Sequence, residues 1–298
     1  MAEILQKDGT WAFDGDALRL APGRDKNVSL LRKTLGELVL PLRALAGVSF
    51  EQGKKTGRLR LRLRDGADPL LLATGGRLTE PHDPYQLIVE SGRYGVAEYF
   101  VDEVRNALLL DQVPADPVDA YLLPGPAVPV SVSAGDGTAS FDGEQVRLEW
   151  NWKTEDAKAA AGARTLALSE ITGVQWHPGV GLENGFLRFT VRNAPAKAPP
   201  KYDPNAVELW NFRKDPLMAL VAAAVQVRLP HPATQVRDVR PVLAEAALAA
   251  SAPAPAPAVE DGHDAVLRRL RELGELHRSG VLTDEEFAVA KRAILRKM

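Results

Sequence analysis

GTWAFDGDALRL, from Gly9 to Leu20, returns later in the chain as GTASFDGEQVRL, from Gly137 to Leu148. In both stretches an Asp-Gly step lies between short apolar runs, which is a strong local signal for a tight β-hairpin. Asp14 of the first stretch corresponds to Asp142 of the second. The stretch therefore predicts a fold that is both β-rich and duplicated.

Three further landmarks follow the hairpin in the same order in both copies. They are LAGVSFEQG and ITGVQWHPG, GRLRLRLR and GFLRFTVR, and the Asp-Pro steps at 83–84 and 203–204. The last landmark lies closer to its predecessor in the second copy, so a deletion falls between them there. Matches in a constant order predict two copies of one domain.

Each copy is expected to consist of short strands followed by one helix. Leu59, Leu61 and Leu63 alternate with arginines, as in a strand with one buried and one solvated face. After the last strand the apolar spacing becomes helical. In the first copy the helical stripe is Val96, Phe100, Val104 and Leu108. In the second copy, Asp215 is expected to cap a helix that begins at Pro216.

About seven strands and one closing helix make each copy resemble a pleckstrin-homology-like (PH-like) barrel. Two such copies, with the FDG hairpin and the ITGV step from Ile171 to Val174, resemble a tandem PH-like family of high-GC bacteria known by a domain-of-unknown-function label. The resemblance covers roughly residues 1–230 and implies a fold but no chemistry. The expected class is α+β, mainly β, with two tandem PH-like barrels and a C-terminal helical hairpin.

Proline-rich segments divide the chain into five parts. We expect repeat 1 at 1–110, a Pro-rich linker at 111–129, repeat 2 at 130–230, a Pro/Ala-rich linker at 231–263 and a helical hairpin at 264–298. The first linker is expected to be extended. The second contains SAPAPAPA, which favours polyproline II and a semi-rigid spacer.

The C-terminal segment is predicted to form two amphipathic helices. Gly280 is placed to end the first, and Thr283 with Glu286 forms a capping box for the second. The apolar positions are Leu267, Leu270, Leu273, Leu276, Phe287, Ala290, Ile294 and Leu295. With its GVLTDEEF turn, the segment resembles the SHOCT (short C-terminal) domain, and that resemblance implies oligomerisation or partner binding.

A hairpin of this size needs a surface to dock on, because chains below about 40 residues rarely bury enough apolar surface alone. The chain has no cysteine to staple it. The apolar stripe therefore pairs either with the same stripe of another copy, giving a homo-oligomer, or with a repeat of its own chain. The Pro-rich spacer favours self-association, because it gives the hairpin reach.

Composition narrows the classes of function. A net charge of -2 argues against a protein that coats nucleic acid. The absence of cysteine excludes disulfides and thiolate sites. The segment MAEILQKDGTW does not resemble a secretory signal, and no apolar stretch reaches the roughly 18 residues that a transmembrane helix needs. We therefore expect a cytoplasmic protein with at most peripheral membrane contact.

One basic stripe is the strongest charge feature. It consists of Lys54, Lys55, Arg58, Arg60, Arg62 and Arg64. Guanidinium groups on one strand face can bind phosphates or carboxylates. The alternative is a solvated face that acidic neighbours across the sheet neutralise. The second copy does not repeat the stripe.

Other motifs favour a structural interpretation. Trp150 and Trp152 continue a period-2 pattern, so we expect core or rim positions rather than an exposed platform. The five histidines lack metal-ligand spacing, and no phosphate-binding loop or nucleophile elbow occurs, so no catalytic residue, metal or cofactor is expected. The sequence predicts a non-enzymatic scaffold with a protein partner. The alternative is peripheral recognition of an anionic membrane by the basic stripe.

Overall fold

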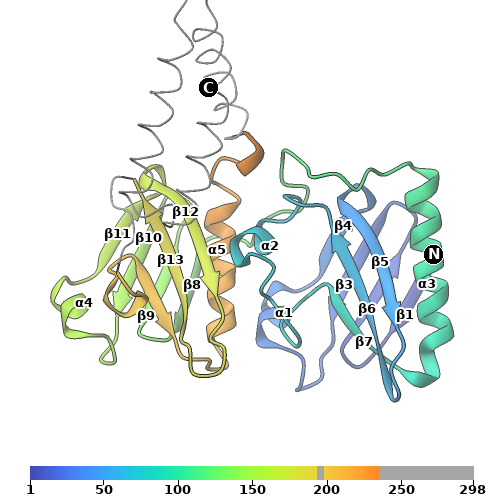
Figure 1. The fold of residues 1–298 in the computed structure, drawn as a ribbon, viewed down its shortest axis with the longest axis horizontal. Coiled ribbons are helices and arrows are strands. Elements are labelled where there is room, and N and C mark those ends of the chain that lie inside the picture. Colours follow the sequence, from blue (N-terminus) through green and yellow to red (C-terminus); the bar gives the residue numbers. More distant parts are fainter. Residues whose placement is uncertain (193–197, 235–298) are drawn as a thin grey trace, which may run out of the picture. The chain divides into compact units, whose positions relative to one another are not determined.

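The computed structural model describes residues 1–192 and 198–234, in which both copies lie within one compact unit. Each copy has a four-stranded sheet, a three-stranded sheet and a C-terminal helix (Figure 1). The strands of repeat 1 are β1 (Ala2–Leu5), β2 (Gly9–Phe13), β3 (Ala17–Pro22), β4 (Leu38–Pro41), β5 (Leu45–Glu51), β6 (Thr56–Leu63) and β7 (Gln86–Glu90). Those of repeat 2 are β8 (Val130–Ala134), β9 (Gly137–Phe141), β10 (Gln145–Trp150), β11 (Arg164–Ala167), β12 (Ile171–His177), β13 (Gly185–Val191) and β14 (Ala206–Leu209).

Five helices accompany these strands in the described residues. They are α1 (Leu30–Leu35), α2 (Pro69–Thr74), α3 (Tyr94–Leu110), α4 (Asp156–Ala160) and α5 (Met218–Gln226). Short 3-10 turns are η1 (Leu42–Ala44), η2 (Ser91–Arg93), η3 (Leu168–Glu170), η4 (Pro200–Tyr202) and η5 (Asp215–Leu217). The mainly β, α+β class is thus confirmed, with helices α3 and α5 ending the two repeats.

The predicted hairpins are confirmed and have the same geometry in both repeats. The Asp14 carboxylate accepts hydrogen bonds from the backbone N–H groups of residues 16 and 17, and the Asp142 carboxylate accepts the equivalent pair from 144 and 145. Gly15 and Gly143 both have φ of 115°, a conformation that only glycine adopts readily. The repeated FDG motif therefore encodes a repeated turn.

The sheets do not close into barrels, which corrects that part of the prediction. All described strand pairs are antiparallel, and the orders are β1-β2-β3-β4 and β5-β6-β7, repeated as β8-β9-β10-β11 and β12-β13-β14. The 3-10 turns η1 and η3 separate the two sheets of each repeat. Packing of α3 or α5 against strands of the sheets, rather than further strand pairing, completes each repeat.

The period-2 and helical patterns place their residues as expected. Leu59, Leu61 and Leu63 are buried in β6 while the intervening arginines face outward. On α3, Phe100 and Val104 are fully buried, and the two outer members of the predicted stripe are half-buried. Burial of such side chains is the main source of stability in a fold of this kind.

A buried ion pair that the sequence patterns did not predict occurs in each repeat. In repeat 1, Arg32 of α1 lies 2.7 Å from Asp8, and their side chains are 5% and 22% exposed. In repeat 2, Lys158 of α4 lies 2.6 Å from Asp136, and their side chains are 0% and 2% exposed. The acidic partner precedes the second strand of its repeat in both cases. The ion pair is therefore part of the duplicated domain.

The second oxygen of each buried carboxylate binds the last strand of its repeat. Asp8 accepts a hydrogen bond from the backbone N–H of Ile88, and Asp136 accepts one from that of Glu208. Each carboxylate thereby joins the first hairpin, a short helix and the three-stranded sheet. This arrangement links the two sheets of a repeat without a continuous barrel.

The helices that end the two repeats have different surroundings. Helix α3 is amphipathic, and its outer face carries exposed residues such as Tyr99 and Leu109. Every residue of α5 is buried. Asp215 does not cap α5 as predicted, because it lies within η5 and its carboxylate accepts a hydrogen bond from the N–H of Phe212. The carboxylate thus bonds to the backbone of the turn that precedes it in the chain, and not to the first N–H groups of α5.

Helix α5 packs against the strands of its own repeat, and helix α2 of repeat 1 packs against it as well (Figure 1). This helix lies between β6 and β7, in the segment that the second copy lacks. Asp68 caps it by accepting hydrogen bonds from the N–H groups of Leu70 and Leu71. Leu70 and Ala73 of α2 then join the apolar core of repeat 2. The additional segment of repeat 1 therefore holds the two repeats together.

The first linker contains no helix or strand and is hydrogen-bonded to repeat 1. Backbone N–H groups of Val118 and Leu122 donate to the carbonyls of Asp65 and Ala67, and Leu123 is buried. The second linker from residue 235 and the predicted hairpin at 264–298 lie outside the described residues. In the described part of the chain, no helix combines the length and apolar character needed to cross a bilayer.

Candidate functional site

The predicted basic stripe lies on the outer face of β6 and in the turn before it. Arg58, Arg60 and Arg62 are exposed and Arg64 is half-buried. Lys54 and Lys55 are exposed in the β5–β6 turn. The structure therefore brings the four arginines onto one strand face, which we call the arginine face.

Half of the arginine face is engaged in a polar network. Arg58 lies 3.4 Å from the Glu80 carboxylate, and Arg60 donates a hydrogen bond of 3.1 Å to the Gln86 side-chain oxygen. The Gln86 amide donates in turn to Glu80 at 3.0 Å. The Glu80 carboxylate thus partly neutralises Arg58, while the neutral Gln86 amide holds Arg60. For Arg58 the structure favours the alternative of a face neutralised by its neighbours.

The remaining basic residues differ in role. Arg64 donates to the backbone carbonyls of Asp116 and Arg43, so it holds the linker rather than a ligand. Among the described residues, Arg62 has no ion-pair or hydrogen-bond partner, and the same holds for the side chains of the two lysines in the turn. Of the six residues of the predicted stripe, all of which the structure describes, these three keep charges that remain available to an anion.

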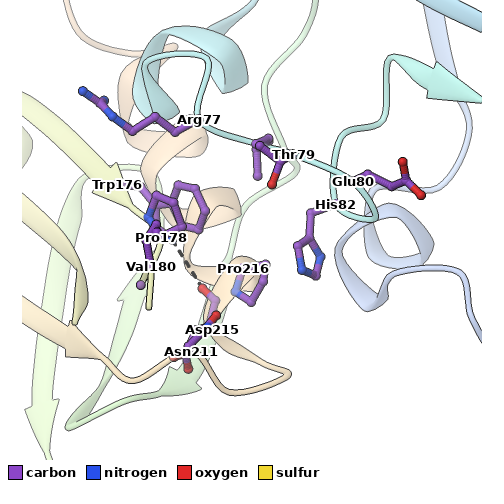
Figure 2. Close-up of a pocket in the computed structure, with 12 residues that line it drawn as sticks. Arg77, Thr79, Glu80, His82, Trp176, Pro178, Val180, Asn211, Asp215 and Pro216 are labelled. Atoms are coloured by element: carbon purple, nitrogen blue, oxygen red, sulfur yellow. Dashed lines mark hydrogen bonds between the residues drawn. The ribbon is translucent and has the colours of Figure 1, made fainter. Parts of the chain in front are cut away.

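A surface pocket of about 440 Å³ lies where the two repeats meet (Figure 2). Repeat 1 contributes the segment after α2, and repeat 2 contributes the β12–β13 loop and the loop after β14. Its lining residues are Arg77, Leu78, Thr79, Glu80, His82, Trp176, Pro178, Gly179, Val180, Asn211, Asp215 and Pro216. We call this pocket the junction recess. Its volume and largely apolar lining fall in the range of ligand pockets.

Three titratable groups of the junction recess have partners within the fold. His82 shares a hydrogen bond of 2.8 Å with Ser29, and burial lowers the pKa of His82. Glu80 is held by the arginine network. Burial raises the pKa of Asp215, although the Phe212 N–H bond opposes that shift. The fold therefore holds these three groups, whereas the exposed Arg77 and Thr79 side chains have no hydrogen-bond or ion-pair partner among the described residues.

Trp176 forms one wall of the recess and is held in place by the backbone. Its indole N–H donates at 3.4 Å to the Asp215 carbonyl (Figure 2). Asn211 has a φ of 67°, which is uncommon for a residue other than glycine. A fixed aromatic wall and an unusual backbone conformation together indicate a preformed pocket rather than a loosely packed one.

Sequence reasoning missed the junction recess because its two sides come from different repeats. The useful signal was the longer spacing between landmarks in the first copy. That additional segment contains α2 and the residues from Arg77 to His82 that face repeat 2. An insertion present in one repeat of two is a candidate for contact between them.

The two tryptophans of the period-2 pattern separate in the structure. Trp150 is half-buried, and the Lys158 ammonium lies 4.3 Å from its ring centroid. Trp152 is 88% exposed, so the prediction of a core or rim position is wrong for this residue. Strand β10 ends at Trp150, and the alternation therefore has no structural meaning beyond that point.

The described residues contain no group of three or more His, Cys, Asp or Glu side chains that could hold a metal ion. His177 stacks on Phe186 with ring centroids 4.5 Å apart, and His231 packs against Tyr121. His263 and His277 lie outside the described residues. The predicted oligomerisation residues from Leu267 to Leu295 also lie outside them.

Comparison with family models supports both resemblances noted in the sequence. The model described as Domain of unknown function (DUF4429) matches residues 11–105 and 139–226, once in each repeat. The model described as Short C-terminal domain (SHOCT) matches residues 268–295. A search of curated proteins gave no match. The tandem arrangement and the C-terminal domain are thereby confirmed.

Proposed function

Since this chain belongs to the DUF4429 family and carries a C-terminal SHOCT domain, we propose that it is a non-enzymatic scaffold. In this proposal the paired PH-like repeats present a protein-binding surface, and the C-terminal hairpin joins copies of the chain. The observation that carries the proposal is the junction recess, a preformed pocket that neither repeat has alone.

The chemistry of the recess supports binding of a peptide segment. Leu78, Trp176 and Pro216 offer apolar contact, and a few polar groups at the margin can orient a backbone or side chain. A peptide could also bind such a domain by docking beside its C-terminal helix. That mode is closed in repeat 2, because every residue of α5 is already buried.

The engaged polar groups favour binding over catalysis. A general acid or base must reach the proton it transfers, and an activated nucleophile needs a base beside it. In the recess, His82 is bonded to Ser29, and Glu80 is bonded to Gln86 and paired with Arg58. These groups stabilise the fold around the pocket instead of acting on one another.

Substitution of Thr79 by Trp tests the recess. Thr79 is exposed and lines the pocket, so T79W fills it without disturbing the core. We expect the amount of partner protein recovered with the tagged full-length chain to fall by roughly tenfold or more. A tenfold loss of affinity corresponds to about 1.4 kcal/mol of binding free energy. T165W, on the exposed face of β11, is the matched control. Equal recovery with both variants, measured by quantitative mass spectrometry, would contradict the proposal.

The proposed role of the hairpin rests on its size and pattern. A segment of that length with leucines on one stripe needs a partner surface. Every other copy of the chain supplies such a surface, namely its own identical hairpin. Deletion of residues 264–298 is expected to lower the mass measured by light scattering while circular dichroism keeps its β-rich character. An unchanged mass would show that the hairpin docks on its own chain or not at all.

A second candidate function is recognition of an anionic surface by repeat 1. The observation that favours it is a pocket of about 470 Å³ lined by Gly47, Ser49, Arg60 and Arg62, in which the Arg62 charge has no described partner. In repeat 2, Thr190 takes the place of Arg62, and Arg188, which corresponds to Arg60, pairs with Asp203 at 2.9 Å. Vesicle flotation of K54E/K55E/R62E against R43E tests this function, and equal binding by both would dismiss it.

A further inference from the structure

Repeat 2 carries large apolar side chains at the tips of three loops. Trp152 is 88% exposed, Leu182 102%, Val180 68% and Phe212 56%. They belong to the β10–α4 loop, the β12–β13 loop and the loop after β14. We call Trp152, Leu182 and Phe212 the aromatic tip, because Val180 also lines the junction recess. Scattered exposed apolar residues are normal, but a gathering of large ones marks an interaction surface.

Contacts within the tip bring the three loops together. The Lys153 ammonium lies 5.3 Å from the Trp152 ring centroid, 5.3 Å from that of Trp210 and 5.5 Å from that of Phe212. Asn184 donates a hydrogen bond to Glu208, next to the third loop. One lysine is therefore surrounded by aromatic rings from two loops, and the third loop lies beside them.

Repeat 1 shows that the fold does not require this surface. By the correspondence of the landmarks, Arg24 takes the place of Trp152 and Gly92 that of Phe212. The loop that carries Val180 and Leu182 is replaced by the turn with Lys54. The same three loops are polar in one repeat and apolar in the other. The aromatic tip is thus a property of repeat 2 and not of the domain.

Positively charged residues flank Trp152 and Phe212 of the aromatic tip. Arg213 and Lys214 are exposed, and neither has an ion-pair or hydrogen-bond partner for its side chain among the described residues. Of the neighbouring acids, Glu208 is bonded to Asn184 and Trp210, and Asp215 is buried. Glu183 is exposed at the edge. Glu155 and Asp156, which follow the Trp152 loop, are also exposed, and Glu155 lies 4.0 Å from Lys201. Next to the apolar side chains in the sequence stand Lys153, Arg213 and Lys214, so positive charge lies directly beside Trp152 and Phe212.

We propose that the aromatic tip of repeat 2 inserts into an anionic phospholipid surface. Apolar side chains that project from loop tips can enter the interfacial region, where tryptophan is favoured. Flanking lysine and arginine residues stay at headgroup depth and attract anionic lipid. The inference goes beyond the proposed scaffold function, because it places repeat 2 on a membrane while the junction recess binds protein.

Binding of full-length protein to vesicles tests the proposal. We expect it to float with vesicles that contain phosphatidylglycerol and not with phosphatidylcholine alone. All five tryptophans lie in the described part of the chain, and only Trp152 is exposed. Its emission is therefore expected to shift to the blue on binding and to be quenched by lipids brominated in the acyl chain.

Two variants separate the apolar and the electrostatic contributions. W152S/L182S/F212S should lower binding by roughly tenfold or more, because three large side chains lose their contact with lipid. K153E/R213E/K214E should lower it at least about fivefold in low salt, since each charge contributes near the surface. L109S/L110S on α3 changes side chains of similar exposure and should leave binding unchanged. Thermal melting checks that each variant is folded.

Several outcomes would overturn the proposal. They are no flotation of the wild type, equal flotation of the aromatic-tip variant, and no quenching of Trp152 by brominated lipid. Loss of flotation in K54E/K55E/R62E together with retention in the aromatic-tip variant would assign the membrane contact to repeat 1. Loss of a protein partner in the aromatic-tip variant without vesicle binding would assign the tip to protein recognition. T79W is expected to float normally, so failure of the recess and failure of the tip are distinguishable.

Discussion

Helices α3 and α5 occupy the same place in the two repeats, yet one faces solvent and the other is enclosed. The sequence of α3 alternates apolar and charged residues, while that of α5 is MALVAAAVQ. A helix that is apolar on all sides must be covered on all sides. Its own sheets cover one side of α5, and α2 of repeat 1 covers another. The duplicated domain has thus diverged so that one copy completes the other.

The same divergence runs through the surfaces. Repeat 1 has the arginine face and the insertion, and repeat 2 has the aromatic tip. The junction recess needs both, since residues from each repeat line it. Duplication supplied two similar frames, by which we mean the two sheets of each repeat and the side chains buried between them. The loops and helices around each frame took on different roles. Predictions that treat the two repeats as equivalent should therefore hold inside the frames and fail for the surrounding loops and helices.

The largest expected effect concerns the ion pair inside each frame. Lys158→Ala should lower the free energy of unfolding by about 4 kcal/mol, because it leaves Asp136 buried without its partner. Arg32→Ala should cost about half as much, since Asp8 is 22% exposed and water can reach it. Urea unfolding of both variants measures the difference. Equal losses would show that burial does not distinguish the two pairs.

Replacing both members of the pair in repeat 2 is the control. K158M/D136N removes the unpaired charge, so part of the lost stability should return. The ammonium also donates to the backbone carbonyl of Ala206 at 2.7 Å, which methionine cannot do. Recovery is therefore expected to be partial, and complete failure to recover would indicate that the hydrogen bonds matter more than the charge.

The next effect concerns the contact between the repeats. Leu70→Ala in α2 should cost about 3 kcal/mol, because Leu70 is 3% exposed and lies in the core of repeat 2. Denaturant unfolding should then change from one transition towards two, as the repeats lose their coupling. Leu109→Ala in α3 is the matched control, and it should change stability by less than about 0.5 kcal/mol. Equal effects would mean that α2 is not the main connection.

Local patterns predicted the interior of each frame well. The Asp-Gly turns, the alternating leucines of β6 and the α3 stripe depend on residues that are close in the chain. Closure of a sheet into a barrel depends on pairing between strand edges that are distant in the chain. No local pattern contains that information, and the prediction of closed barrels was wrong for that reason. Trp152 was misplaced because the period-2 pattern continues past the end of its strand.

The site was harder to predict than the fold. Charge patterning located the arginine face, but it could not reveal that Glu80, which follows α2, would pair with Arg58. The junction recess combines loops that lie about 100 residues apart, a separation at which sequence spacing carries no geometric information. Asp215 was expected at a helix start, and the 3-10 turn that encloses it was not foreseen.

The smallest expected effect is a pH dependence at the junction recess. Burial lowers the pKa of His82 below its ordinary value of 6.5, so the unfolded chain takes up a proton before the folded one does. The His82 contribution to stability is therefore present above about pH 6.5 and is lost as the pH falls through the lower pKa of the folded state. Protonation also makes Nδ1 a donor in its hydrogen bond with the Ser29 hydroxyl, which accepts from the Leu31 N–H as well.

His82→Gln isolates this contribution from that of the acids. Burial raises the pKa of Asp83 and Asp215, and groups with raised acid pKa values favour the folded state as the pH falls. The wild-type profile is the sum of both tendencies. Subtracting the H82Q profile should leave a stability difference that decreases from neutral to mildly acidic pH, measured by denaturant unfolding. Because Ser29 caps α1, and Leu31 of α1 lies in the core of repeat 2, this loss should loosen the contact between the repeats. A flat difference would indicate that His82 does not couple the pocket to the junction.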